Sequence, residues 1–183
     1  MIKEKLMVSA IILSYKHEKY IKKAIESILI QETDFEYELI IADDCSPDNT
    51  KKIVTDIIEK HPKAFRIKYF RQKKNIGMLA NGNFSLNKAE GKYIAFCEGD
   101  DYWIDSLKLK KQVNFMEENP GFSCCAHNTI IKHENAINSN LQQFNTINNK
   151  NDTLFKKDFM NISKFHTSSI LLRKTFIENI INK

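Results

Sequence analysis

The chain alternates between short, fully apolar runs and stretches in which apolar residues recur every three or four positions. A fully apolar run is typical of a strand buried in a parallel sheet, and the longer period is typical of an amphipathic helix. The runs lie at 6–15, 37–42 and 93–97, and the helical stretches at 21–29, 47–60 and 107–118. The alternation predicts an α/β domain of βαβ units with a mostly parallel sheet.

The remaining segments give weaker patterns. Residues 65–71 alternate apolar and basic positions, which predicts a strand near the sheet edge. Residues 78–90 predict a helix that buries Leu79, Phe84 and Leu86 and stops at Gly91. Strands are expected at 122–131 and 165–172, and a short helix from Thr175. Two helix starts have candidate caps, Ser46 or Asp48 for one and Asp105 for the other. Residues 134–153 are asparagine-rich without a fixed period and predict a mobile surface loop.

Length and composition favour one domain, 1–183, with no internal repeat. The residues before Lys183 do not read as a domain edge, so we expect the C-terminal part of the domain to lie beyond them. The net charge of +5 is spread along the chain, which suits an anionic small ligand and does not favour nucleic acid. The sequence gives no signal of oligomeric state.

Cysteine usage and hydropathy bear on location. Four cysteines occur without a CxxC pair, which favours reduced thiols over disulfides or a zinc site. No signal peptide or membrane-spanning apolar stretch is present in the sequence. We therefore expect a cytoplasmic protein. Loose peripheral association with the inner, anionic face of a membrane stays open as an alternative.

Three carboxylates, Glu98, Asp100 and Asp101, directly follow the apolar run at 93–97. Ligands of open α/β sheets bind beyond the carboxyl ends of strands, which is where these groups fall. Clustered carboxylates repel one another unless a cation lies between them, and oxygen ligands suit Mg²⁺ or Mn²⁺. The alternative is capping of the next helix, but Asp105 lies nearer to that helix. A metal or ligand site is therefore the favoured interpretation.

A second acidic pair, Asp43 and Asp44, follows the run at 37–42. Carboxylates therefore stand again at the carboxyl end of a predicted strand, where ligands of open α/β sheets bind. A simple turn explains the pair equally well. The residues alone leave the two alternatives open.

These segments, in this order, resemble the family 2 glycosyltransferases, which have the GT-A fold and use nucleotide sugars. The resemblance covers nearly the whole chain except the asparagine-rich stretch. The motifs that carry it are VSAIILSY at 8–15, IIADDCSPDNT at 40–50, NIG at 75–77, GKYIAFCEGDDYW at 91–103, KLKKQVNFMEENP at 108–120 and HTSSILLRK at 166–174.

The resemblance implies a three-layer, Rossmann-like GT-A fold and a role for each matching residue. Asp44 would bind the nucleotide base, with Asp43 as its neighbour or ribose-side partner. Asp100 and Asp101 would hold Mn²⁺ or Mg²⁺ at the donor diphosphate, and Glu98 stands where the family usually has aspartate. The other implied nucleotide-binding residues are Leu13, Ser14, Tyr15, Asn75 and Gly77.

The resemblance leaves the sugar and acceptor side less defined. Trp103 can line the sugar or pack in the core, and His166 can face the acceptor or be structural. The general base of inverting members would lie beyond Lys183. The predicted function is a metal-dependent glycosyltransferase of hexosyltransferase type that uses a UDP-sugar.

Its acceptor would be a glycan, a lipid-linked molecule or a protein, in the synthesis of surface polysaccharide or glycoconjugate. Two alternatives stay open, a non-catalytic nucleotide-sugar-binding module and a sugar nucleotidyltransferase. The second is disfavoured because residues 13–19 contain no glycine.

Overall fold

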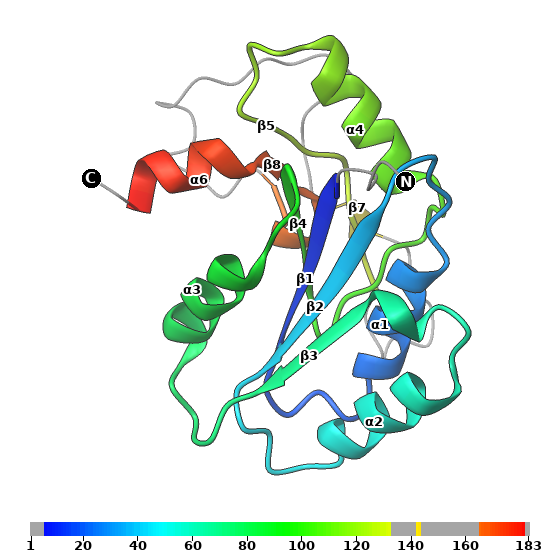
Figure 1. Ribbon diagram of the computed structural model, residues 1–183. Helices are drawn as coiled ribbons and strands as arrows, with labels where there is room; N and C mark the ends of the chain where they lie inside the picture. Colours follow the sequence, from blue (N-terminus) through cyan, green and yellow to red (C-terminus); the bar gives the residue numbers. More distant parts are fainter. Residues whose placement is uncertain (1–5, 133–141, 144–164, 182–183) are drawn as a thin grey trace, which may run out of the picture.

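The computed structural model describes residues 6–132, 142–143 and 165–181 (Figure 1). Within these residues, one six-stranded sheet has the order β3-β2-β1-β4-β8-β5. Its first four members are parallel, and β8 runs antiparallel to both β4 and β5. Their bounds are β1 Val8–Ser14, β2 Tyr37–Asp43, β3 Ile67–Arg71, β4 Tyr93–Glu98, β5 Cys124–Cys125 and β8 Leu171–Arg173. A mostly parallel sheet is therefore confirmed.

Helices cover both faces of the sheet, which gives three layers. Figure 1 shows α1, α2 and α4 on one side and α3 and α6 on the other. Their bounds are α1 Ile21–Leu29, α2 Thr50–Lys60, α3 Met78–Lys88, α4 Lys108–Glu118 and α6 Lys174–Ile181. Two 3-10 helices, η1 Ala64–Arg66 and η2 Thr167–Ser169, precede β3 and β8. None of the helices in the described part of the chain is long and apolar enough to cross a membrane.

The core divides along the two faces of the sheet. Alternate residues of β1, such as Ala10 and Ile12, pack with the apolar stripes of α1, α2 and α4. Their neighbour Ile11 packs on the opposite face, where Leu86 of α3 and Ile177 of α6 lie. The two-residue period of the strands is therefore satisfied on both sides, which explains why the central strands read as continuous apolar runs.

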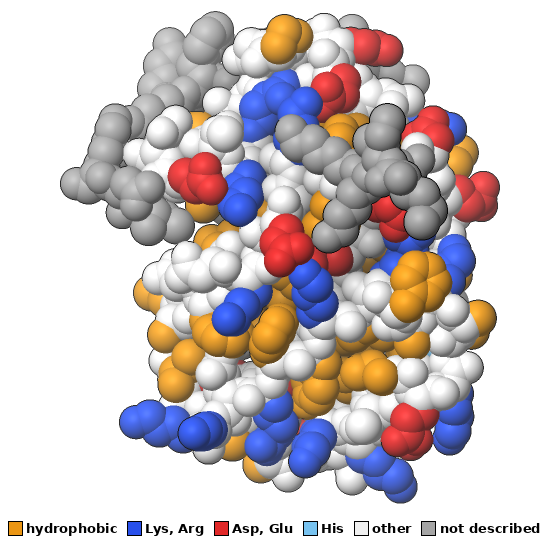
Figure 2. Space-filling view, in the orientation of Figure 1, with side chains coloured by type: hydrophobic (Ala, Val, Ile, Leu, Met, Phe, Trp, Pro, Cys, Tyr) orange, Lys and Arg blue, Asp and Glu red, His pale blue; other side chains and the backbone are white. Residues whose placement is uncertain are grey.

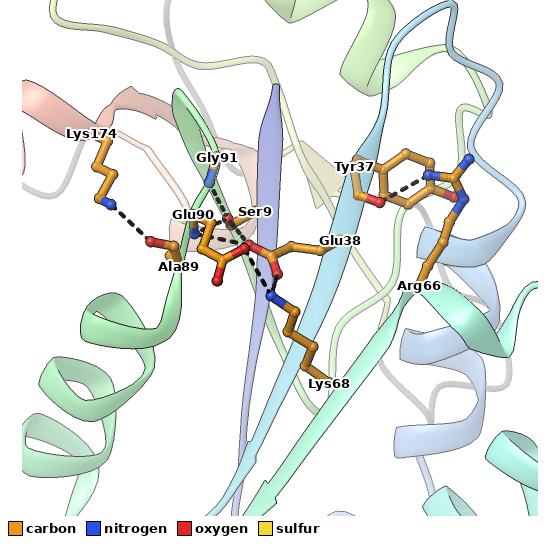
Figure 3. Close-up of polar contacts among 9 residues, drawn as sticks. All are labelled: Ser9, Tyr37, Glu38, Arg66, Lys68, Ala89, Glu90, Gly91 and Lys174. Carbon is orange, nitrogen blue, oxygen red and sulfur yellow. Dashed lines mark hydrogen bonds and ion pairs between the residues drawn. The ribbon is translucent and has the colours of Figure 1, made fainter. Parts of the chain in front are cut away.

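A polar network closes the amino end of the sheet (Figure 3). The Glu38 carboxylate accepts hydrogen bonds from the Ser9 hydroxyl at 2.5 Å and the Glu90 backbone N–H at 2.9 Å. It also lies 2.7 Å from the Lys68 ammonium group. A Cβ on Gly91 would lie 2.5 Å from the Ser9 backbone nitrogen, so only glycine fits beside β1. This network lies at the end of the strands opposite to the acidic clusters.

Several local expectations are wrong. Leu79 is 79% exposed, whereas Leu86 packs against the core and Phe84 against Phe70 of β3, and the most buried residues of α3 are the polar Asn81 and Ser85. α3 ends at Lys88, before Gly91. The strand expected at 122–131 is two short strands in different sheets, β5 and β6 (Ile130–Ile131), because the chain leaves the six-stranded sheet after Cys125.

The late strand expected at 165–172 is also shorter than predicted. Its first half forms η2, and β8 starts only at Leu171. α2 begins at Thr50 and not near Pro47, although Asp48 does accept a hydrogen bond from the Thr50 N–H at 3.1 Å. The loop expected at 134–153 lies outside the described residues, apart from β7 (Gln142–Gln143), which pairs with β6.

Candidate functional site

The strand register places the candidate residues at one edge of the sheet. Ser14 is paired with Asp43, and Leu13 is paired with Glu98. Backbone hydrogen bonds continue past the strand ends, from the Asp44 N–H to the Ser14 carbonyl at 2.9 Å and from the Gly99 N–H to the Leu13 carbonyl at 3.1 Å. Both acidic clusters and the end of β1 therefore lie along one edge of the sheet, with β1 between the two clusters.

Asp44 connects this edge to the loop before α3. Its two carboxylate oxygens accept hydrogen bonds from the backbone N–H groups of Ile76, at 2.7 Å, and Gly77, at 2.9 Å. The Asn75 side chain accepts a second bond from the Gly77 N–H at 3.1 Å. Gly77 has a φ of +86°, a conformation that favours glycine. The predicted nucleotide residues Asn75, Gly77 and Asp44 thus form one structural unit.

Asp43 is fully buried and holds the neighbouring loop. Its carboxylate accepts hydrogen bonds from the Ser46 N–H and the Tyr69 hydroxyl, both at 2.8 Å, and lies 3.3 Å from the Arg71 Nε. Burial and the hydrogen bond to Asp43 raise the pKa of Tyr69, so this phenol stays protonated at neutral pH. Asp43 therefore stabilises the loop after β2 from a buried position, through Ser46, Tyr69 and Arg71.

The predicted metal residues lie together after β4. One carboxylate oxygen each of Glu98, Asp100 and Asp101 lies within 4.8 Å of the others. Glu98 and Asp100 are exposed, and Asp101 is partly buried. Three hard oxygen donors on one accessible turn match the ligand preference of Mg²⁺ or Mn²⁺. The donor set therefore fits a divalent cation, and a metal bound there would still have open positions for a ligand.

The segment 166–168, which lies far along the chain, reaches the same turn. Ser168, through its hydroxyl, donates a hydrogen bond to Asp101 Oδ2 and accepts one from the Glu98 N–H at 3.1 Å. The His166 Nδ1 lies 3.4 Å from the same Asp101 oxygen. His166 is therefore placed beside the acidic cluster, while Ser168 was not identified from the sequence.

His17, at the start of the loop after β1, was also missed. A Cβ on Gly99 would lie 2.2 Å from the His17 Nδ1, so the imidazole is packed directly against the acidic turn. Nδ1 is buried and has no hydrogen-bond partner within the described residues. The glycine between two carboxylates was the available signal, since it marks a close approach of another group.

Trp103 takes the core-packing alternative. It is 5% exposed, and its indole N–H donates to the Ser168 carbonyl at 3.0 Å. The Lys108 ammonium lies 4.0 Å from the centre of the indole ring and 2.7 Å from the Gln112 side-chain oxygen. Burial lowers the pKa of Lys108 to about 7. The described contacts of Trp103 thus anchor the segment after the acidic turn and do not form a sugar-facing wall.

The surroundings of the site are basic. Figure 2 shows mostly Lys and Arg side chains along the lower edge of the molecule, where the carboxyl ends of β1 to β3 lie in Figure 1. The exposed lysines of these loops include Lys16, Lys19, Lys73 and Lys74. An open hollow of about 490 Å³ in the loops after β1 and β2 is lined by Lys16, Glu18, Lys19, Tyr20, Pro47 and Asp48. Positive charge around the site favours an anionic ligand.

Sequence comparison connects this site to one family. The family model described as glycosyl transferase family 2 matches residues 9–181. An uncharacterized protein of Mycobacterium bovis, Mb1547, is 42% identical over 126 residues, which are 69% of this chain and 36% of that protein. A Bacillus subtilis protein provisionally named teichuronic acid biosynthesis glycosyltransferase TuaG is 38% identical over 114 residues, 62% of this chain and 43% of that protein.

Structure comparison agrees on the fold. TarS residues 1–349 of S. aureus match with a TM-score of 0.64 and 24% identity, over 96% of this chain and 49% of that chain. The mannosyltransferase PcManGT of Pyrobaculum calidifontis, in complex with GDP-Man and Mn²⁺, matches with a TM-score of 0.67 and 19% identity, over 94% and 46%. The expected GT-A fold is therefore confirmed. The chain spans less than half the length of each of these four proteins.

Proposed function

Because the chain belongs to glycosyl transferase family 2, we propose that it is a glycosyltransferase domain, 1–183, that binds a nucleotide-sugar donor at the carboxyl edge of its sheet. The observation that carries the proposal is the acidic turn, Glu98, Asp100 and Asp101, which a backbone hydrogen bond joins to the end of β1, with the Asp44 loop bonded to the other side of β1. A divalent cation and a nucleotide loop at one edge suit a nucleoside diphosphate sugar.

We assign Asp100 and Asp101 as the principal holders of Mn²⁺ or Mg²⁺, with Glu98 beside them. A bound divalent cation stabilises the negative charge that develops on a departing diphosphate. The chain's own part is to keep two carboxylates on a turn that is closed by the hydrogen bond from the Asp101 N–H to the Glu98 carbonyl, 3.0 Å long. Complexes of PcManGT with GDP-Man and Mn²⁺ support a metal in this fold.

For the nucleotide we favour uridine diphosphate. TarS has been crystallised with UDP and with UDP-GlcNAc, which supports this choice. Leu13, Ser14 and Tyr15 would line the base and ribose. Each carboxylate oxygen has two lone pairs, so Asp44 can bind a base N–H while it holds the Ile76 and Gly77 amides.

We propose inversion at the sugar carbon and a glycan, lipid-linked or protein acceptor. The name of TuaG supports a role in surface polysaccharide or glycoconjugate synthesis. For the location we propose the cytoplasm, with peripheral association at the inner face of the membrane as the alternative. We assign His166, whose Nδ1 lies 3.4 Å from Asp101 Oδ2, to the sugar or acceptor side of the site. We assign the acceptor base to none of the described residues.

The metal assignment is tested with the Asp100→Ala and Asp101→Ala double variant. Both positions lie on a turn outside the core, so the variant is expected to fold like the wild type. UDP binding measured by calorimetry should lose its Mn²⁺ dependence, while the weaker metal-free binding stays. A double variant that binds UDP as tightly as the wild type in Mn²⁺ would refute the assignment.

A further inference from the structure

Ser168 adds side-chain contacts to both ends of the acidic turn, which a backbone hydrogen bond from the Asp101 N–H to the Glu98 carbonyl closes. Its hydroxyl accepts a hydrogen bond from the Glu98 N–H at 3.1 Å and donates one to Asp101 Oδ2. Its carbonyl accepts the Trp103 indole N–H at 3.0 Å. Ser168 is 6% exposed, so these bonds are shielded from water. Ser168 thus binds the Glu98 amide at the start of the turn, the Asp101 carboxylate at its end and the Trp103 indole that follows it.

We propose that Ser168 is a positioning residue for cation binding: it fixes the rotamer of the Asp101 carboxylate and the shape of the Glu98–Asp101 turn. This inference rests on the proposed metal site. Ser168 lies behind Asp101 and touches neither donor nor metal in the proposal. Among the described residues, the contacts of the Asp101 carboxylate, from Ser168 and His166, are both on Oδ2. They leave Oδ1 for a cation.

The physical reason is the cost of ordering a charged side chain. A free aspartate on a turn samples several rotamers and turns toward a cation only part of the time. A hydroxyl that donates to one oxygen selects one rotamer before the cation arrives. Removing such outer partners typically costs roughly 10- to 100-fold in metal affinity. The same hydroxyl also holds the Glu98 amide, so its loss loosens both ends of the turn.

Ser168→Ala tests this with Mn²⁺ binding and not with activity. Free Mn²⁺ is followed by electron paramagnetic resonance at saturating UDP, and UDP affinity in EDTA is measured by calorimetry. We expect about 10- to 100-fold weaker Mn²⁺ binding and unchanged metal-free UDP affinity, because the Asp44 loop does not contact Ser168. Ser168→Thr, which keeps the hydroxyl, should restore Mn²⁺ binding.

Ser85→Ala is the matched control. Ser85 is a fully buried serine of α3 whose hydroxyl donates to the Gly82 carbonyl at 2.7 Å, away from the acidic turn. It should leave Mn²⁺ affinity unchanged even if it lowers the melting temperature. A merely structural Ser168 would behave in the same way. Should Ser168→Ala fail to fold, Ser168→Cys takes its place, since a thiol is a weak donor of similar size.

The outcomes separate this inference from the proposed function. A wild-type chain that binds Mn²⁺ with UDP, together with a Ser168→Ala or Ser168→Cys variant of equal Mn²⁺ affinity, would overturn the positioning role alone. A folded wild-type chain that binds no Mn²⁺ would overturn both. The inference is supported if Ser168→Ala binds Mn²⁺ more weakly than the wild type, while Ser168→Thr and Ser85→Ala bind it with wild-type affinity.

Discussion

Asp44→Asn tests whether the nucleotide loop depends on a single carboxylate. Asp44 is 4% exposed, and its two oxygens accept the Ile76 and Gly77 amides at 2.7 and 2.9 Å. Asparagine keeps one acceptor oxygen and places an amide NH₂ group against the other N–H. One hydrogen bond to a charged group is lost, at a cost of about 1.5–3 kcal/mol.

This cost should appear as local opening of the loop. Asn75 and Ile76 are exposed at the surface, so the loop can detach while the sheet stays folded. If UDP binds only the closed loop, a closed state made less stable by this amount lowers the affinity in proportion, because each 1.4 kcal/mol is about a tenfold change. We therefore expect UDP to bind about 10- to 100-fold more weakly.

Hydrogen exchange and calorimetry measure the two effects separately. The amides of Ile76 and Gly77 should exchange faster in Asp44→Asn, and UDP affinity in EDTA should fall. Asp48→Asn is the control, because Asp48 also accepts two backbone amides, those of Thr50 and Glu18, both at 3.1 Å, in a neighbouring loop. Unchanged exchange at Ile76 and Gly77, or equal UDP affinity in Asp44→Asn and wild type, would refute the reasoning.

Two further predictions concern the acidic turn and the core beside it. Gly99→Ala puts a Cβ 2.2 Å from the His17 Nδ1, so the turn must shift, and Mn²⁺ affinity should fall by about tenfold or more. Gly121→Ala is the control, because the space around its Cβ is open. A Gly99→Ala variant that binds Mn²⁺ as tightly as the wild type would contradict the packing argument. Lys108 has a folded pKa of about 7 against an ordinary 10.5, so unfolding takes up a proton between these values and stability rises with pH by up to about 1.4 kcal/mol per unit. Urea unfolding of Lys108→Met from pH 7 to 9 should show a smaller pH slope than the wild type, and identical slopes would show that Lys108 is charged in the folded protein.

The central fold was predictable because its signals are local. Strands buried on both faces must be apolar throughout, and helices packed on one face must repeat every three or four residues, as the buried stripe Ile21, Ala24, Ile25, Ile28 and Leu29 does. The buried positions of α3 could not be predicted in this way, because its most buried residues, Asn81 and Ser85, are polar. The helix holds the sheet through Asn81, whose side chain donates to the Ala42 carbonyl at 2.8 Å and accepts from Gln72 at 3.1 Å. A hydrophobic period cannot detect such a contact.

The site was predictable to the extent that its residues follow strands directly. The carboxylates stand at the ends of apolar runs, and parallel strands bring those ends together. Ser168 acts on Asp101 from 67 positions away, and no spacing rule connects a serine in an apolar segment to that turn. The position of His17 beside the acidic turn could not be predicted for the same reason, since it follows only from the contact with Gly99 in the folded chain.

The most direct test of the account is calorimetric titration of UDP into the folded wild-type chain with Mn²⁺, repeated with EDTA and with GDP in place of UDP. The account predicts that UDP binds, that EDTA weakens binding by removing the cation from the Glu98, Asp100 and Asp101 turn, and that GDP binds more weakly than UDP. Absence of UDP binding in Mn²⁺ by a chain shown to be folded would contradict the proposal that this edge of the sheet is a nucleotide-sugar site.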